Sequence, residues 1–163
     1  MKHLAKRSQI KRGSATLEAA LIFLPLFALV FAIVDFGFAM FLRSTFQHAV
    51  REGCRYAVTS QKKAGMGHDA SIASEVKYNA LGFLNSSTVG SGGGCTICIR
   101  YFDADTGLEV AANAPGNIVQ VSVENYGWTW MAPIWRTSAG LTINVRAADR
   151  MEGLPPGSLS PVR

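Results

Sequence analysis

The chain has 163 residues, of which 48% are hydrophobic and only 17% are charged. Ordinary soluble domains carry about 25% charged residues, so this composition fits a membrane anchor followed by one small domain. The formal net charge is +5, and the five Lys and Arg residues of the first 13 positions account for all of it. A nucleic-acid-binding domain needs a basic patch on its folded body, so we do not expect nucleic acid as a partner.

The first predicted element is an apolar helix over residues 19–42, whose sequence is AALIFLPLFALVFAIVDFGFAMFL. As a helix it would be about 36 Å long, enough to cross a hydrocarbon core of about 30 Å. A buried helix of a soluble protein would keep a polar face, and this segment has none. The apolar run is longer than the core of a cleaved signal peptide. We therefore expect a transmembrane helix that stays in the mature protein.

The flanks of this helix predict its orientation. The basic leader places the N-terminus in the cytoplasm, so residues after about 43 lie outside it. Pro25 lacks the N–H of the helix ladder and should kink or loosen the first turns. Asp35 has two open interpretations, a position at the outer membrane interface or a contact with a partner helix.

Beyond the membrane we expect the helix to continue to about Thr59, because apolar residues recur at helical spacing. That face consists of Phe46, Val50, Gly53 and Ala57. Its glycine would let another backbone approach. A different face carries polar and basic side chains four residues apart, namely Arg43, Gln47, Arg51 and Arg55. We interpret it as a solvated face, with contact to lipid phosphates or to acidic patches of neighbouring subunits as the alternative.

A loop, a second helix and a linker are predicted next. Residues 60–68 read as the loop, and Asp69 could cap a helix that extends to about Leu84. The apolar face of this helix would consist of Ile72, Val76, Ala80 and Phe83. Residues 85–94, NSSTVGSGGG, have the composition of a flexible linker.

After the linker the apolar residues alternate with a period of two. Residues 95–102 and 108–112 flank a turn and predict a hairpin. Residues 118–126 and 141–147 alternate in the same way. Together they predict a small antiparallel sheet with one apolar face, which the outer half of the long helix would cover.

Two segments near the C-terminal end carry little periodic signal. The aromatic segment 128–135, WTWMAPIW, is interpreted as a plug at the edge of the core, with a subunit or membrane-surface contact as the alternative. Residues 153–163 contain three prolines and are expected to be a disordered tail.

The three cysteines all fall in the part expected outside the cytoplasm, where disulfides persist. Cys95 and Cys98 are three residues apart and would face opposite sides of a strand. A Cys54–Cys95 disulfide is therefore the preferred pairing, and a Cys95–Cys98 disulfide, which needs a tight turn, is the alternative. One thiol is left over in either case.

Catalytic and metal chemistry find no support in the sequence. A zinc site needs about four ligands, and the three histidines show no useful spacing. No nucleophile–base set stands out, and a redox CxxC motif would be followed by a helix where a strand is predicted. We therefore expect no metal, no cofactor and no enzymatic activity.

Three short motifs carry a family resemblance. They are RGSATLE at 12–18, VDFG at 34–37 and REGCRYA at 51–57. This text resembles the TadE-like family of pseudopilins, most densely over residues 11–59. Trp128, Pro133 and the strand near residues 141–148 also resemble the family's C-terminal text. Cys54 departs from the family's usual alanine, a substitution that keeps the residue small.

The resemblance implies processing by a prepilin peptidase after Gly13. Ser14 would then be the first residue, and Glu18 the fifth, where it would pair with the new N-terminal ammonium of a neighbouring subunit. The alternative is that Gly13 is a linker residue and Glu18 an acid at a helix start. The family motif on the outer helix consists of Arg51, Glu52, Gly53, Arg55 and Tyr56.

The expected fold is α+β, with a long pilin-like transmembrane helix that extends into a small extracytoplasmic antiparallel sheet and a second short helix. The expected parts are a basic cytoplasmic leader at 1–13, the long helix at 14–59, the extracytoplasmic α+β part at 60–152 and the tail at 153–163. The resemblance implies a minor pilin or pseudopilin of a Tad-type, type IVb-like pilus and secretion system, serving adhesion or secretion. A permanently anchored accessory protein of the same machinery is the alternative.

The partners that follow are a prepilin peptidase, other pilin or pseudopilin subunits, the inner-membrane assembly platform and the lipid bilayer. The expected location is the inner, cytoplasmic membrane as a single-pass protein, with its C-terminal part outside the cytoplasm, or the pilus itself.

Overall fold

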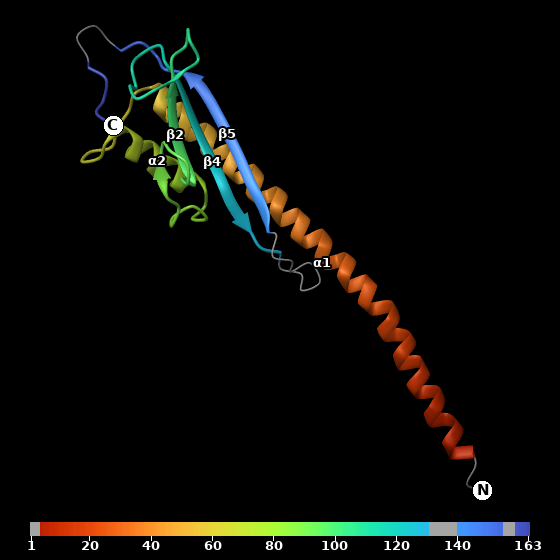
Figure 1. The fold of residues 1–163 in the computed structure, drawn as a ribbon. Coiled ribbons are helices and arrows are strands. Elements are labelled where there is room, and N and C mark those ends of the chain that lie inside the picture. The colour runs from red at the N-terminus through yellow and green to blue at the C-terminus, as the bar shows by residue number, and fades with distance from the viewer. Residues whose placement is uncertain (1–3, 131–139, 155–158) are drawn as a thin grey trace. The chain divides into compact units, whose positions relative to one another are not determined.

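The computed structural model describes residues 4–130, 140–154 and 159–163, with side chains within the first helix described from Ala15 onward. The elements in chain order are α1 (Leu4–Val58), α2 (His68–Asn79), β1 (Val89–Gly90), β2 (Ile97–Phe102), β3 (Glu109–Val110), β4 (Ile118–Trp128) and β5 (Leu141–Arg150) (Figure 1). The chain divides into two compact units. One contains Met1–Ala39 and Thr129–Gly140, and the other, called the head below, contains Met40–Trp128 and Leu141–Arg163.

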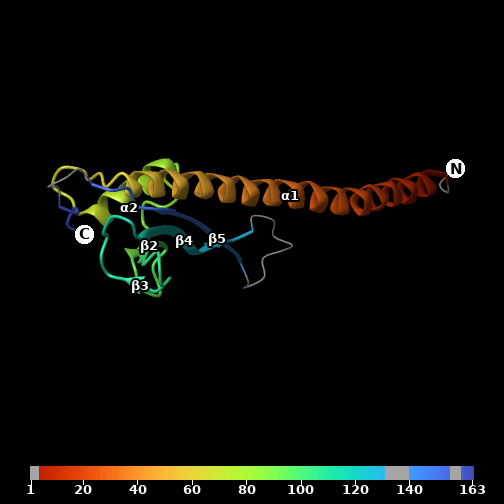
Figure 2. The ribbon, with the colours of Figure 1, turned by 90° about the horizontal axis from the view of Figure 1, so that it is seen from above.

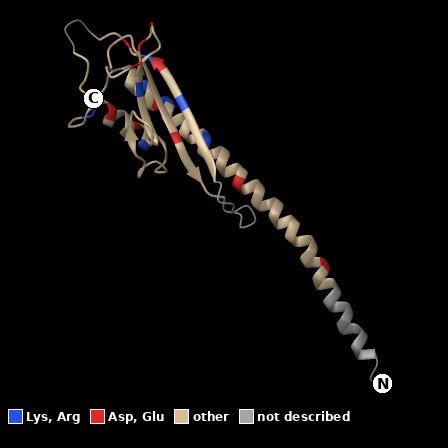
Figure 3. Ribbon diagram, viewed as in Figure 1, with Lys and Arg blue, Asp and Glu red and all other residues tan. Residues whose placement is uncertain are grey.

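Helix α1 is 55 residues long and continues through Pro25. It contains an 18-residue window of mean hydropathy 2.6 of which none is buried, so it is long and apolar enough to cross a membrane. Its large exposed apolar side chains run from Leu17 to Phe41. Figure 3 shows this stretch free of charge apart from two acidic positions, which the sequence identifies as Glu18 and Asp35.

Helix α1 begins at Leu4 and so includes most of the segment expected to be the leader. Five of the thirteen leader residues are Lys or Arg, which favour helix. A single glycine within a helix costs only about 1 kcal/mol relative to alanine, too little to stop a helix with strong formers on both sides.

The expected α+β class is confirmed, but the sheet is mixed and not antiparallel throughout. The strand order is β1-β2-β4-β5, with β3 also paired to β2. Strand β1 pairs with β2 in parallel, and every other pair is antiparallel. Strand β1 lies in the segment expected to be only a flexible linker. The hairpin is confirmed, since Tyr101 pairs with Val110 and Phe102 with Glu109 around the turn.

One face of the sheet packs against the head part of α1 and against α2 (Figures 1 and 2). Both expected helix faces are buried at their centres, and Phe46 packs edge-to-face on Tyr126 with ring centroids 4.7 Å apart. Burying one such aliphatic or aromatic side chain is worth about 1.5–3 kcal/mol. The fully or nearly buried sheet residues are Ile97, Ile99, Tyr101, Val119, Val121, Val123, Ile143 and Val145.

Helix α2 is shorter than predicted and is capped differently. It ends at Asn79, because Leu81 and Gly82 adopt positive φ angles of 53° and 86°, which no α-helix accommodates. Its N-cap is Gly67, without a side-chain cap hydrogen bond. The side chain of Asp69 is used elsewhere, as described below, so the predicted cap is wrong.

The described residues at the end of the expected tail are hydrogen-bonded to the rest of the head. The backbone N–H of His68 donates to the carbonyl of Val162 over 2.8 Å, and Asn113 Nδ2 donates to the carbonyl of Pro161 over 2.7 Å. Proline carbonyls remain free to accept such bonds even though prolines lack the donor. Most of the aromatic segment 128–135 lies outside the described residues.

Candidate functional site

The REGCRYA motif lies on the head part of α1, where its glycine sits at the closest approach of α2. A Cβ atom added at Gly53 would lie 2.4 Å from Val76 Cγ2 and 3.7 Å from Val121 Cγ1. The sequence predicted a close approach here, but to another backbone. The structure instead brings side chains of α2 and β4 onto the glycine, so the residue serves packing within the head.

Two arginines of the motif point away from this core. Arg51 and Arg55 are exposed, and both line a groove of about 670 Å³ between α1 and β5. The groove also contains Arg146, Asp149 and Glu152. Gln47 Nε2 donates to the carbonyl of Arg146 over 3.2 Å and joins the two walls.

The two remaining motif residues, Glu52 and Tyr56, are half-buried on a third side of α1. They line a smaller cleft of about 260 Å³ that also contains Glu75 of α2. The carboxylate of Glu75 pairs with Lys63 over 3.2 Å. The motif thus serves three sides of α1, one packed in the core and two facing clefts.

The predicted processing and charge-pairing residues lie along the first half of α1. Gly13 and Ser14 are inside the helix. Glu18 is exposed among apolar neighbours, whereas Asp35 is only 2% exposed. The chain itself therefore covers the carboxylate of Asp35, and it does not cover that of Glu18.

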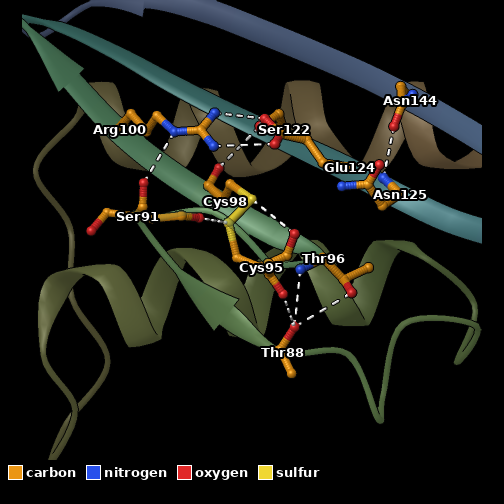
Figure 4. Close-up of a disulfide and its surroundings, with 12 residues drawn as sticks. Thr88, Ser91, Cys95, Thr96, Cys98, Arg100, Ser122, Glu124, Asn125 and Asn144 are labelled. Carbon is orange, nitrogen blue, oxygen red and sulfur yellow. Dashed lines mark hydrogen bonds and ion pairs between the residues drawn. A yellow bond between two sulfur atoms is a disulfide. The ribbon is translucent and has the colours of Figure 1, made fainter.

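The structure joins Cys95 to Cys98 (Figure 4). It leaves Cys54 as a buried thiol. The preferred Cys54–Cys95 pairing is therefore corrected in favour of the alternative. The parity argument failed because β2 begins only at Ile97, so Cys95 precedes the strand and follows Gly94, whose φ is +93°.

Labelling with iodoacetamide tests this pairing. The denatured, unreduced chain should take up one alkyl group, at Cys54, and the reduced chain should take up three. Peptide mass spectrometry then locates the groups. An unreduced chain labelled at Cys98 in place of Cys54 would contradict the assignment.

An ion pair beside the disulfide fastens two strands together. Arg100 of β2 donates to both carboxylate oxygens of Glu124 on β4, over 2.6 and 3.1 Å (Figure 4). Arg100 Nε also donates to the carbonyl of Ser91, next to β1. The guanidinium lowers the pKa of Glu124 below its usual range, and a bidentate pair of this kind fixes geometry as well as charge. Within the described residues, no group of three His, Cys, Asp or Glu side chains is arranged to hold a metal ion.

A comparison with protein families bears on the segment that contains the three motifs. Residues 13–55 match the model of the TadE-like protein family. This segment is TadE-like. The match begins at the predicted processing glycine and ends within the REGCRYA motif. Neither a curated protein nor a solved structure matches the chain. The resemblance seen in the sequence is thus confirmed over residues 13–55, and its C-terminal part lies outside the match.

Outside the TadE-like segment, the head contains a buried polar network that the sequence analysis missed. Tyr101 of β2 donates its hydroxyl proton to Asp69 Oδ1 over 2.8 Å. Its oxygen lies 3.2 Å from Nδ1 of His68, a fully buried residue. Arg163 pairs with Asp69 Oδ2 over 2.8 Å, and its guanidinium lies 4.7 Å from the centre of the Tyr101 ring. The network fastens residues 159–163 to α2 and the sheet.

Burial dominates the electrostatics of this network. It lowers the pKa of His68 below its ordinary value, although the neighbouring Asp69 acts in the opposite direction. It also raises the pKa of Tyr101, and Asp69 raises it further. His68 Nε2 has no hydrogen-bond partner of good geometry among the described residues, although the carbonyl of Ala57 is close enough to raise the histidine pKa. In the sequence, the only sign of this network is the adjacent pair His68 and Asp69, which begins α2.

Proposed function

We propose that the chain is a minor pilin or pseudopilin of a Tad-type pilus and secretion system, a structural role and not a catalytic one. A prepilin peptidase would cut it after Gly13, and α1 would be its assembly element. The leader would lie in the cytoplasm and the head outside it. Adhesion or secretion would be served by the assembled fibre.

The observation that carries this proposal is the exposed acid on the apolar surface of α1. Glu18 is five residues beyond Gly13 and is surrounded by exposed apolar side chains. A carboxylate exposed in such a position is accessible to a positively charged group of a second chain, and pairing with one lowers the cost of a charge in lipid. The ammonium group that cleavage creates at Ser14 of a neighbouring subunit would supply that charge.

Changing Gly13 to lysine tests the processing step. We expect native membranes to yield a mature chain that begins at Ser14, and the Gly13→Lys variant to retain its leader. Lysine would not fit a narrow protease subsite that admits glycine, which has no side chain. Intact mass and N-terminal sequence give the readout. A wild-type chain that still begins at Met1 beside an active peptidase would refute the proposal and leave a permanently anchored accessory protein.

A second variant, Glu18→Gln, separates assembly from processing. It should be cleaved normally and reach the membrane in ordinary amounts, because it leaves the cleavage glycine intact. Its amount in sheared pili, measured by immunoblot against the wild type, should fall at least tenfold. Equal incorporation of the two proteins would mean that Glu18 does not pair with a neighbour's ammonium.

A further inference from the structure

A cationic hollow lies on α1 where its exposed apolar surface ends. Phe41 is the last large exposed apolar residue of the helix, and Leu42 and Phe46 are fully buried in the head. The other side of these turns is open and forms a hollow of about 490 Å³. Its lining residues follow one another at helical spacing on a single stripe, namely Met40, Arg43, Ser44, Gln47, His48 and Arg51.

The chemistry of this hollow is that of an anion site. It offers two guanidinium groups, an imidazole and a hydroxyl, and no acidic residue lines it. Within the described part of the chain, the ion pairs use Lys63, Arg100 and Arg163, so neither Arg43 nor Arg51 is neutralised. The neighbouring groove toward β5 shares Gln47 and Arg51 with this hollow, but it differs in that Asp149 and Glu152 line it.

The dimensions of a bilayer match this placement. Its polar headgroup layer adds about 5–8 Å to each side of the hydrocarbon core. At about 1.5 Å per residue, Arg43 lies about 3 Å beyond Phe41 along the helix axis, His48 about 10 Å beyond it and Arg51 about 15 Å beyond it. Side chains of a helix tilt toward its N-terminus, which for α1 is the apolar end. Long arginine side chains such as that of Arg51 therefore reach back toward the headgroup layer.

We propose that this hollow binds the phosphate of an anionic phospholipid in the leaflet where α1 leaves the membrane. Arg43 would bind the phosphate oxygens, because a guanidinium group matches phosphate in a bidentate geometry. Arg51 lies about 12 Å further along the helix axis and would reach back toward the same headgroup. The hydroxyl of Ser44 and the imidazole of His48 would add donors, and Met40 would contact the glycerol and the first methylenes. The bound lipid would fix the depth of α1. This inference rests on the membrane insertion of the proposed function and not on cleavage after Gly13.

The test uses the full-length chain in detergent micelles and native mass spectrometry. Phosphatidylglycerol is titrated against phosphatidylcholine, and the bound lipids are counted. We expect selective retention of phosphatidylglycerol, weakened at least tenfold in the Arg43→Gln/Arg51→Gln variant. The control variant Arg55→Gln/Arg146→Gln removes the same charge from the neighbouring groove and should bind like the wild type.

Three outcomes would overturn the inference. Equal retention of the two lipids would remove the anion specificity, and equal weakening in both double variants would make it an effect of net charge. Displacement of the lipid by inorganic phosphate or glycerol 3-phosphate at the same concentration would assign the hollow to free anions. Loss of self-association in the Arg43→Gln/Arg51→Gln variant, without any change in lipid retention, would mean that the hollow binds a neighbouring subunit.

Failure of this inference is distinguishable from failure of the proposed function. The uncleaved Gly13→Lys variant keeps the hollow, so it should bind phosphatidylglycerol as the wild type does. Normal cleavage and pilus incorporation in the Arg43→Gln/Arg51→Gln variant, together with unchanged lipid retention, would refute the lipid site and leave the proposed function standing.

Discussion

The Gly53→Ala variant is expected to unfold at a lower temperature than the wild type. Its new methyl group would lie 2.4 Å from Val76 Cγ2, a distance that real side chains do not tolerate. Val76 is fully buried, and its branched side chain has little rotamer freedom with which to move away. Overpacking of this kind costs about 1–3 kcal/mol, while the helix preference of alanine offsets about 0.5–1 kcal/mol.

The matched control is Gly37→Ala, the same substitution on the same helix. Apart from the helix's own backbone, no atom of the described residues lies within 4 Å of the added Cβ there, so no clash among them opposes the helix preference of alanine. Circular dichroism of the detergent-solubilised chain would follow unfolding, with about 4–8 °C expected for each kcal/mol lost from a small domain. Equal melting temperatures for the two variants would contradict the packing role of Gly53.

A double variant identifies the partner in the clash. Val76→Ala removes the Cγ2 atom that the new methyl group would strike. The Gly53→Ala/Val76→Ala variant should therefore lose less stability than the sum of its two single variants. Additive losses would place the origin of the destabilisation elsewhere.

Those parts of the fold that depend on local pattern could be predicted from the sequence. The apolar run predicts the exposed stretch of α1, because a helix of this length without a polar face is typical of a membrane span and not of a soluble protein. Strands β2, β4 and β5 follow from alternation, and the hairpin follows from the turn that ends at Gly107, where φ is 68°. The close approach at Gly53 was also expected, although the approaching group was not.

The remainder depends on contacts between residues far apart in the chain. The short parallel strand β1 carries too few residues to show a period, and its pairing with β2 is visible only in three dimensions. The end of α2 is set by positive φ angles at Leu81 and Gly82. The angle at Leu81 could not be predicted, because leucine rarely adopts a positive φ. Cysteine pairing required the exact start of β2, and element boundaries are the least predictable feature of a sequence.

The polar network around His68 predicts that the head loses stability in acid. His68 is fully buried, and burial lowers its pKa below the ordinary value of 6.5. The other titratable or charged groups around it are Asp69, Tyr101 and Arg163. Asp69 favours the charged imidazole and Arg163 opposes it, but burial is the largest influence.

The sign follows from proton linkage. Between pH 6.5 and the lower folded pKa, the unfolded chain binds a proton that the folded chain excludes. The free energy of unfolding should therefore fall as the pH decreases from about 6.5 toward 5, by up to about 1.4 kcal/mol for each pH unit. The pKa of Glu124 is held below its usual range by Arg100, so the contribution of that carboxylate is lost only at more acidic pH.

Two histidine variants assign this pH dependence to its residue. Thermal melts of the wild type, His68→Gln and His48→Gln from pH 8 to pH 5 provide the measurement. His68→Gln should be less stable at pH 8, because it disturbs the buried network, and should lose the slope between pH 6.5 and pH 5. His48 is exposed, so its substitution should leave the slope unchanged. A slope that persisted in His68→Gln would mean that the destabilising proton is bound elsewhere, and that the network tolerates a charged imidazole in the core.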